Sequence, residues 1–280
     1  MPNYVTNVVY AKDVKVLKKF TKMENGERVF DFNKIIPMPK DLDITNGSMS
    51  YIDNDFGFDK ERHTRQTKVI DPLLNKFYTP KITQNKFLSA VKKEWDKIKD
   101  NFKAVYNFKS SKFEEYDTII RGYFNTQRYG YRDWYDWSID KWGTKWNASS
   151  TRIFDKGIQF DTAWSCPVSV LKELSKHTPI VVSFSDEDTG NNYGIYEFNN
   201  GKSKVCLNDK NHMVGEALAC RGSDEEGVCN YFAGDWYSDE EIKEYFGGTR
   251  EEVTEKHIKY FNKVENKLSK ALEKLGGKNE

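Results

Sequence analysis

Residues 160–184 read FDTAWSCPVSVLKELSKHTPIVVSF, and the hydrophobic period changes twice within these letters. Phe160–Trp164 and Ile180–Phe184 have the short apolar pattern that is typical of strands. Between them, residues 167–175 place valine and leucine at helical spacing. The stretch therefore predicts a strand, a short helix and a second strand.

Further strands are expected on both sides. Val5–Val9 is short and β-branched, and Asp13 can cap a helix directly after it. Downstream, Tyr193–Phe198 and Val205–Leu207 flank Asn200-Gly201, a strong hairpin signal. Strands and helices thus mix along the chain, and the expected fold class is α+β.

The middle of the chain favours helices. Residues 84–125 carry apolar side chains at three- and four-residue spacing, and Asp133–Lys141 has the same spacing over a shorter length. Residues 41–68 are polar and rich in Asp, Asn and Gly. We expect this last segment to be a surface loop or an inserted arm.

The C-terminal part begins with an unpatterned segment, 208–237. After it, Ser238 and Thr249 each precede a glutamate by three residues, which is the capping-box signature of a helix start. Apolar residues then recur at helical spacing over Val253–Leu272. We expect one short and one long amphipathic helix, with His257 on the exposed side of the long one.

Charge and composition exclude some classes of partner. The 280 residues include 44 Lys+Arg and 43 Asp+Glu, for a net charge of +1. This balance argues against a strongly basic nucleic-acid binder and against an acidic mimic of DNA, but it leaves room for a local patch of either sign. No apolar run reaches the roughly 18 residues of a membrane span, and the first residues lack a signal-peptide pattern. We therefore expect a cytoplasmic protein that does not engage membranes.

The sequence contains four cysteines, Cys166, Cys206, Cys220 and Cys229. No two of them form a C-x-x-C pair, so a zinc site is not favoured. Cys220 and Cys229 with His212 stay open as a weaker metal alternative. In the cytoplasm we expect reduced thiols.

Tryptophans are concentrated between positions 134 and 148, where the sequence reads WYDWSIDKWGTKWNA. Aromatic side chains with a lysine between them can form a stacking or anion-binding platform. The candidate ligand-binding residues are Trp142, Lys145, Trp146 and Asn147. The alternative, which we favour, is that the indoles build the core and donate to loop carbonyls.

A second cluster is acidic. Asp186, Glu187 and Asp188 follow directly on a predicted strand and can bind a hard cation such as Mg²⁺ or Ca²⁺. Their spacing does not match the calcium-loop pattern, so a solvated turn is the simpler interpretation.

Catalytic signatures are missing from the sequence. It contains no Gly-x-Ser-x-Gly elbow, no P-loop and no pair of histidines at metal-ligand spacing. We identify no catalytic residue and no cofactor, and a non-enzymatic role is favoured.

Five phrases in this order resemble a known family: residues 1–7 (MPNYVTN), 30–39 (FDFNKIIPMP), 134–137 (WYDW), 142–148 (WGTKWNA) and 160–165 (FDTAWS). They are similar to the YubB-like (Api-type) proteins of phages and plasmids, a family of unknown function with a ferredoxin-like domain. No catalytic residue can be carried over from it.

The resemblance implies a ferredoxin-like antiparallel sheet packed by helices. Its core is expected to be split between residues 1–40 and 126–207. A largely helical insertion is expected over 41–125, and an irregular segment with C-terminal helices over 208–280.

The leading functional hypothesis is an accessory protein of a phage or mobile element that binds a host protein and inhibits an antiphage defence system. The long C-terminal helix also suggests a homo-oligomer contact. The alternative is binding of single-stranded nucleic acid, RNA in particular, through aromatic residues on the sheet. Its candidates are Phe160, Trp164, Phe184, Tyr193 and Tyr196. A metal-dependent enzyme that uses the acidic cluster and the 142–147 loop ranks third.

Overall fold

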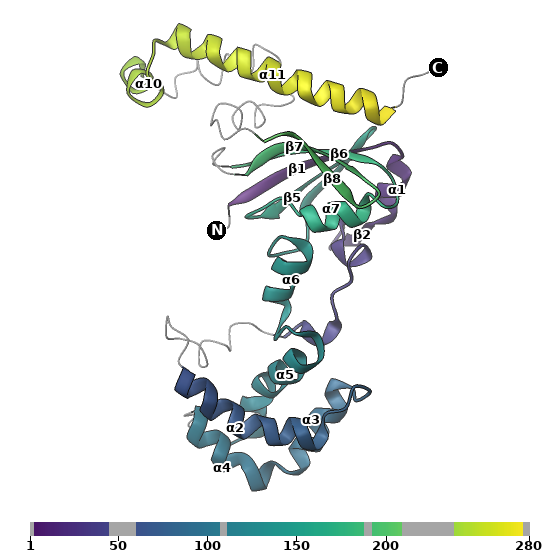
Figure 1. Ribbon diagram of the computed structural model, residues 1–280, viewed down its shortest axis with the longest axis vertical. Coiled ribbons are helices and arrows are strands. Elements are labelled where there is room, and N and C mark those ends of the chain that lie inside the picture. Colours follow the sequence, from purple (N-terminus) through teal and green to yellow (C-terminus); the bar gives the residue numbers. More distant parts are fainter. Residues whose placement is uncertain (1–2, 45–59, 107–110, 188–191, 209–237, 277–280) are drawn as a thin grey trace. The chain divides into compact units, whose positions relative to one another are not determined.

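The computed structural model describes residues 3–44, 60–106, 111–187, 192–208 and 238–276 (Figure 1). The chain divides into two compact units. The sheet unit comprises residues 1–37 and 141–280, and the helical unit comprises residues 38–140. The helical unit contains the segment expected as an insertion and also the chain that leads into the tryptophan-rich helix.

Six strands of the sheet unit form one antiparallel sheet in the order β4-β5-β1-β6-β7-β8. In chain order they are β1 Tyr4–Ala11, β4 Ser149–Phe154, β5 Gly157–Ala163, β6 Ile180–Asp186, β7 Tyr193–Asn199 and β8 Lys202–Leu207. A separate hairpin pairs β2 Thr21–Glu24 with β3 Glu27–Phe30. β1 is central, because its Asn7 lies opposite Phe160 of β5 on one side and Phe184 of β6 on the other.

Two short helices, α1 Val14–Lys19 and α7 Val168–Leu174, complete the pattern. The order β1-α1-β4-β5-α7-β6 is the βαββαβ arrangement of ferredoxin-like folds, with β7 and β8 added at one edge. The expected α+β, ferredoxin-like fold is therefore confirmed. The helical unit is inserted between α1 and β4.

Aromatic rings pack against one face of the sheet. The ring centroid of Phe160 lies 4.9 Å from that of Phe30 and 5.8 Å from that of Phe32. Phe32 begins a 3₁₀ turn, η1 Phe32–Lys34, and its ring lies 5.7 Å from that of Trp142. The segment after β3 is thus held on the sheet by aromatic contacts, and no regular helix or strand is needed there.

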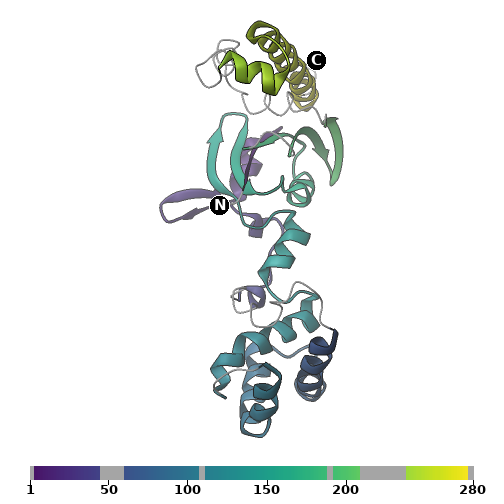
Figure 2. The same cartoon turned by 90° about the vertical axis from the view of Figure 1, so that its left-hand side faces the viewer.

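The long helix α11, Arg250–Gly276, packs on the other face across β6, β7 and β8 (Figures 1 and 2). Four of its side chains meet four from these strands in one cluster: Phe261, Val264, Leu268 and Ala271 with Val181, Tyr193, Ile195 and Leu207. Helices therefore cover both faces of the sheet.

Both predicted capping boxes are present. The Ser238 hydroxyl accepts from the Glu241 N–H at 3.2 Å before α10, Asp239–Phe246, and the Thr249 hydroxyl accepts from the Glu252 N–H at 3.3 Å before α11. The prediction that His257 is exposed is wrong, since only 1% of its surface is accessible. His257 lies four residues from both Val253 and Phe261, so it belongs to the buried stripe, and its Nδ1 lies 2.7 Å from the Val253 carbonyl oxygen.

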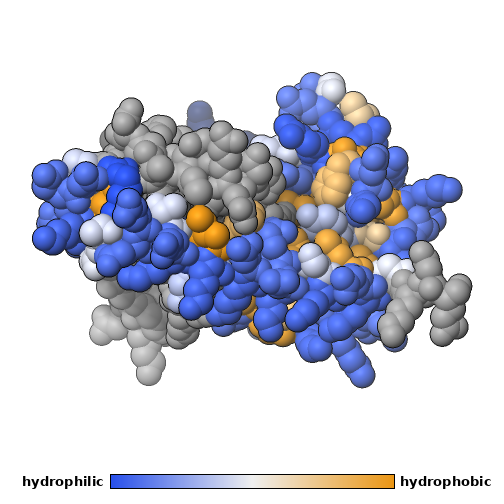
Figure 3. All heavy atoms as spheres, turned by 90° about the horizontal axis from the view of Figure 1, so that it is seen from above, coloured by the Kyte–Doolittle hydropathy of each residue, from blue (hydrophilic) through white to orange (hydrophobic). Residues whose placement is uncertain are grey.

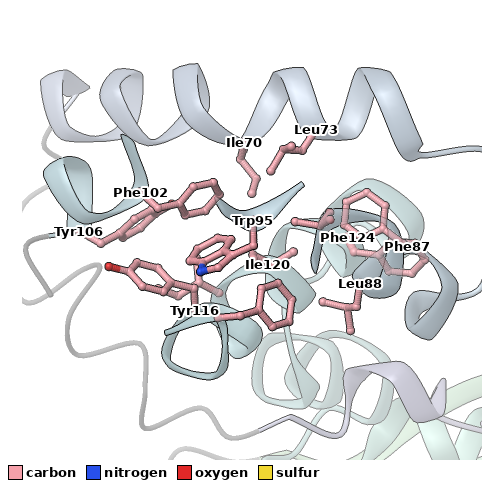
Figure 4. Packing of buried hydrophobic residues seen from close by; sticks show 13 residues of the cluster. Ile70, Leu73, Phe87, Leu88, Trp95, Phe102, Tyr106, Tyr116, Ile120 and Phe124 are labelled. Carbon is pink, nitrogen blue, oxygen red and sulfur yellow. The ribbon is translucent and has the colours of Figure 1, made fainter. Parts of the chain in front are cut away.

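The helical unit is built mainly from α2 Lys60–Phe77, α3 Gln84–Lys93, α4 Trp95–Tyr106, α5 Phe113–Tyr129 and most of α6 Trp134–Trp142. A 3₁₀ turn, η2 Lys40–Leu42, precedes them. Figure 4 shows how their apolar side chains converge. The core cluster comprises Ile70, Leu73, Phe87, Leu88, Val91, Trp95, Phe102, Tyr106, Phe113, Tyr116, Ile119, Ile120 and Phe124.

Buried polar groups tie the start of this unit to its helices. Asn125 accepts from the Gln84 amide at 2.7 Å and donates to the carbonyls of Asp41 and Arg132 at 2.8 and 2.9 Å. The Tyr129 hydroxyl donates to the Asp41 carboxylate at 2.8 Å. These bonds supply partners to buried polar atoms that would otherwise be unsatisfied.

The expected loop over residues 41–68 is partly wrong, because α2 begins at Lys60. Residues 69–77 carry the apolar side chains that pack in the core, and the polar turns before them extend the same helix. Helix propagation adds one hydrogen bond per residue once a nucleus exists, so a polar stretch can join an anchored helix without an apolar stripe of its own. Among the described residues, no helix has both the length and the apolar character that a membrane crossing requires.

Candidate binding surface

Two of the four candidate ligand residues, Trp142 and Asn147, hold the segment after β3 in place by hydrogen bonds. Trp142 is buried and donates from Nε1 to the Ile36 carbonyl at 2.9 Å. Asn147 accepts from the Phe32 N–H at 2.8 Å and donates to the Asp31 carboxylate at 2.9 Å. These contacts hold the segment after β3 against the sheet, as the core interpretation of the tryptophan cluster expects.

The other two candidates reach the surface. The Lys145 ammonium lies 4.6 Å from the centre of the Trp146 ring, within the range of a cation–π contact. Trp146 keeps 40% of its surface exposed. Of the four candidates, Trp142 is therefore buried, Lys145 and Asn147 are half-buried, and Trp146 is exposed.

A second exposed tryptophan stands on a strained turn. Trp164 has a φ of 70°, and 52% of its surface is exposed. The Ser165 N–H donates to the Ala163 carbonyl at 2.9 Å, which makes Trp164 the central residue of a three-residue γ-turn. The γ-turn with positive φ is rare and strained, and a bulky side chain is an outlier there.

Neighbouring segments fix this turn from several sides. The Trp164 N–H donates to the Asn3 carbonyl at 2.8 Å, and the Trp164 carbonyl accepts from the Asn192 side chain at 2.9 Å. The Thr144 hydroxyl donates to the Ala163 carbonyl at 2.7 Å. A strained residue persists when its surroundings determine it in this way.

Polar side chains continue the network into the core. The Asn7 amide donates to the Thr162 hydroxyl at 2.8 Å, and that hydroxyl donates to the Ser165 carbonyl at 2.8 Å. Asn7 and Thr162 are buried, so their hydrogen bonds are shielded from water. The central strand β1 is therefore linked to the Trp164 turn through Asn7 and Thr162.

The two described members of the acidic cluster have different partners. Asp186 is buried and accepts from the Asn192 N–H at 3.0 Å, whereas Glu187 accepts from the Tyr4 N–H at 2.5 Å. Asp188 lies outside the described residues. Among the residues that the structure describes, no three His, Cys, Asp or Glu side chains gather as a metal site. The structure gives Asp186 a clear positioning role, since Asn192 in turn holds Trp164.

Of the cysteines, Cys166 and Cys206 are described, and both are free thiols. Burial raises the pKa of the Cys166 thiol far above its ordinary range. Partial burial and the Glu197 carboxylate also raise the pKa of Cys206. Cys220, Cys229 and His212 lie outside the described residues, so the weaker zinc alternative stays a prediction.

The sheet aromatics proposed for base stacking are mostly covered. Phe160, Phe184 and Tyr193 are buried, and Tyr196 is half-buried. Burial and the nearby Cys166 raise the pKa of Tyr196. Only Trp164 is widely exposed.

Trp164, Tyr4, Lys145 and Trp146 lie on neighbouring segments and keep part of their surface accessible, and we call these four residues together the Trp164 surface. Tyr4 lies opposite Ala163 in the sheet, and Thr144 bonds to the same Ala163, so the three segments run side by side at this end of the sheet. Exposed Trp and Tyr side chains on rigid backbone are typical anchors of protein interfaces. The sequence predicts Trp164 as an aromatic strand residue, and no local signal indicates its turn or its hydrogen bonds to Asn3 and Asn192.

Comparison with known proteins adds one match. Residues 141–226 match the family model of a ferredoxin-like domain in Api92-like protein. The match covers β4 to β8 and α7 but not β1, which the structure places at the centre of the same sheet. No curated protein matches the chain, and no solved structure matches it.

Proposed function

We propose that this chain is an accessory protein of a phage or mobile element, and that it binds a host protein through the Trp164 surface. The observation that carries the proposal is the exposed Trp164 on a strained γ-turn. A left-handed conformation costs a non-glycine residue about 1–2 kcal/mol, and an exposed indole recovers little of that by burial. Burial of the indole by a bound partner would offset the strain that folding alone leaves uncompensated.

The rigidity of the turn suits such a role. The Trp164 N–H donates to the Asn3 carbonyl, Asn192 donates to the Trp164 carbonyl, and Thr144 and the Ser165 N–H donate to the Ala163 carbonyl. These bonds fix the backbone that carries the indole. An interface that orders few side chains on binding loses less entropy, so more of the contact energy becomes affinity.

The surroundings favour a protein partner. Lys145 lies over the Trp146 ring and Glu187 accepts from the Tyr4 N–H, so both charge signs are present beside aromatic residues, as in the polar rim around an apolar anchor. A base-stacking sheet needs several open aromatic side chains, and Phe160, Phe184 and Tyr193 are buried.

The source and target belong to the proposal as well. The phrases at residues 1–39 and 134–165 resemble the YubB-like proteins of phages and plasmids, and the match to an Api92-like domain supports the same grouping. We place the action in the host cytoplasm and take a component of an antiphage defence system as the target.

The test is a comparative capture from host lysate with the full-length chain. Three baits are used: the unchanged chain, Trp164→Gly, and Met23→Ala as a control that truncates another exposed apolar side chain, 60% exposed on the β2–β3 hairpin. The expected result is a host protein that the first and third baits retain and Trp164→Gly loses at least tenfold. Equal retention on all three baits overturns the proposal.

Phage growth provides the readout for the target. Expression of the chain is expected to restore plaque formation on a host that carries the matching defence system, and Trp164→Gly is expected to abolish this effect. If the unchanged chain and Trp164→Gly restore plaque formation equally, the proposed role of the Trp164 surface is contradicted.

A further inference from the structure

Helix α11 carries a row of lysines along its exposed side. The six are Lys256, Lys259, Lys263, Lys267, Lys270 and Lys274, and all are exposed. Their spacing of three or four residues keeps them within about a third of the helix circumference, since each residue turns by about 100°. From first to last, the row spans about 27 Å at 1.5 Å per residue.

The direction of this row is fixed by packing. Phe261, Val264 and Leu268 bury the apolar stripe of α11 against the sheet, and the lysines lie about a third of a turn around from that stripe. Figure 3 looks down on this side and shows mainly hydrophilic residues there. The row is therefore a rigid line of charge on a folded scaffold.

Little acidic charge neutralises the row. Within 256–274 there are six lysines and two glutamates, and Glu265 lies about 160° from the centre of the row. Lys274 lies 3.5 Å from Glu197 of β7. In the described part of the chain, Lys256, Lys259, Lys267 and Lys270 form no ion pair with an acidic side chain. The charge of these four lysines is thus available to an external anion.

The row continues beyond the helix at one end and stops at the other. Exposed Lys204 on β8 lies opposite Glu197, the residue that Lys274 approaches. In contrast, residues 239–255 contain seven acidic and two basic residues. A polyanion would be attracted along the C-terminal part of α11 and repelled at its start.

We propose that this lysine row binds the phosphate backbone of double-stranded DNA, independently of base sequence. A straight, rigid row of about 27 Å matches the rise of about eight base pairs at 3.4 Å each. Single strands are bound chiefly by aromatic stacking, and none of the exposed large hydrophobic side chains in the described ranges lies on α11. A membrane-surface helix inserts its apolar face, whereas the apolar face of α11 is buried on the sheet.

The test measures binding of the full-length chain to a fluorescein-labelled 20-base-pair duplex by anisotropy, between 50 and 200 mM KCl. If all six lysines contact phosphates, affinity is expected to fall roughly a thousand-fold over this range. The triple variant Lys259→Gln, Lys267→Gln, Lys270→Gln removes three contacts, so its affinity is expected to fall only about 40-fold over the same range and to be weaker at 50 mM.

A matched control carries Lys86→Gln, Lys93→Gln and Lys103→Gln, which remove three exposed lysines from the helical unit. It is expected to bind like the unchanged chain. Equal weakening in both triple variants, or no binding at 50 mM KCl, overturns the proposal. Tighter binding to a 20-nucleotide single strand or to phosphatidylserine vesicles than to the duplex also overturns it.

Discussion

The side-chain amide of Asn192 donates to the backbone carbonyl of Trp164 at 2.9 Å. Asn192 is itself held by Asp186, whose carboxylate accepts from the Asn192 N–H at 3.0 Å. The turn that presents the exposed indole is therefore tied to the end of the buried strand β6. This relationship gives Asp186 a positioning role that needs no metal.

The strain at Trp164 predicts an unusual response to substitution. Trp164→Gly removes a large side chain, but glycine adopts a positive φ without steric penalty. We expect the free energy of unfolding to change by less than about 1 kcal/mol, whereas a packed tryptophan would lose about 3–5 kcal/mol on truncation. Urea denaturation followed by circular dichroism measures this, and a loss in the larger range would contradict the account.

The buried network beneath the turn predicts the opposite behaviour for Thr162. Thr162→Val removes two buried hydrogen bonds, from Asn7 and to Ser165, and should destabilise the sheet unit by about 1–3 kcal/mol. Thr6→Val is the matched control. Val5 lies opposite Thr162, so the next residue, Thr6, points to the other face of the sheet, where it is half-buried and bonds to Asp161 at 2.9 Å. Hydrogen exchange of the β5 amides should show a clear loss of protection only for Thr162→Val.

The close approach of two strands predicts that Gly157 tolerates no side chain. A Cβ at this position would lie 2.1 Å from the Val9 carbonyl oxygen, which belongs to the backbone of the central strand. Gly157→Ala should therefore destabilise by at least about 1–3 kcal/mol, as overpacking does. Gly26→Ala separates steric overlap from backbone strain. Nothing lies within 4 Å of a Cβ at Gly26, so this substitution introduces only the strain of a φ of 84°. An unchanged melting temperature for Gly157→Ala would refute the strand register.

Alkaline pH should weaken the helical unit through Tyr129. Burial and the adjacent Asp41 carboxylate raise the pKa of this phenol above its ordinary value. A raised pKa means that the unfolded chain loses the proton first, so the stabilisation is complete below about pH 10 and declines as pH rises further. The 295-nm difference between the unchanged chain and Tyr129→Phe should titrate above pH 10, and titration at or below that value would contradict the contact.

Period and capping signals allow much of the fold to be predicted. The change of period across residues 160–184 predicts β5, α7 and β6, and the boxes at Ser238 and Thr249 predict the starts of α10 and α11. These signals depend only on residues close together in the chain, so a single sequence is enough to detect them. The start of α2 depends instead on the apolar residues that anchor the helix further along, and the burial of His257 depends on which face of α11 meets the sheet.

The Trp164 surface is harder to predict from the sequence than the fold. The hydrogen bonds of Trp164 to Asn3 and Asn192, and that of Ala163 to Thr144, join residues from separate segments of the chain. These segments come together only when the strands pair. The tryptophan-rich segment is predictable as a cluster, but the division into buried Trp142 and exposed Trp146 depends on tertiary packing. The homo-oligomer contact stays a prediction that sedimentation can check.

A photo-crosslinking amino acid at position 164, introduced into the full-length chain in living host cells, tests the central claim most directly. The same group at position 23 is the control. We predict one dominant adduct of defined mass at 164 that is missing at 23 and that disappears when unmodified chain is added in excess. No adduct at 164, or the same adducts at both positions, would contradict a protein-binding role for this surface.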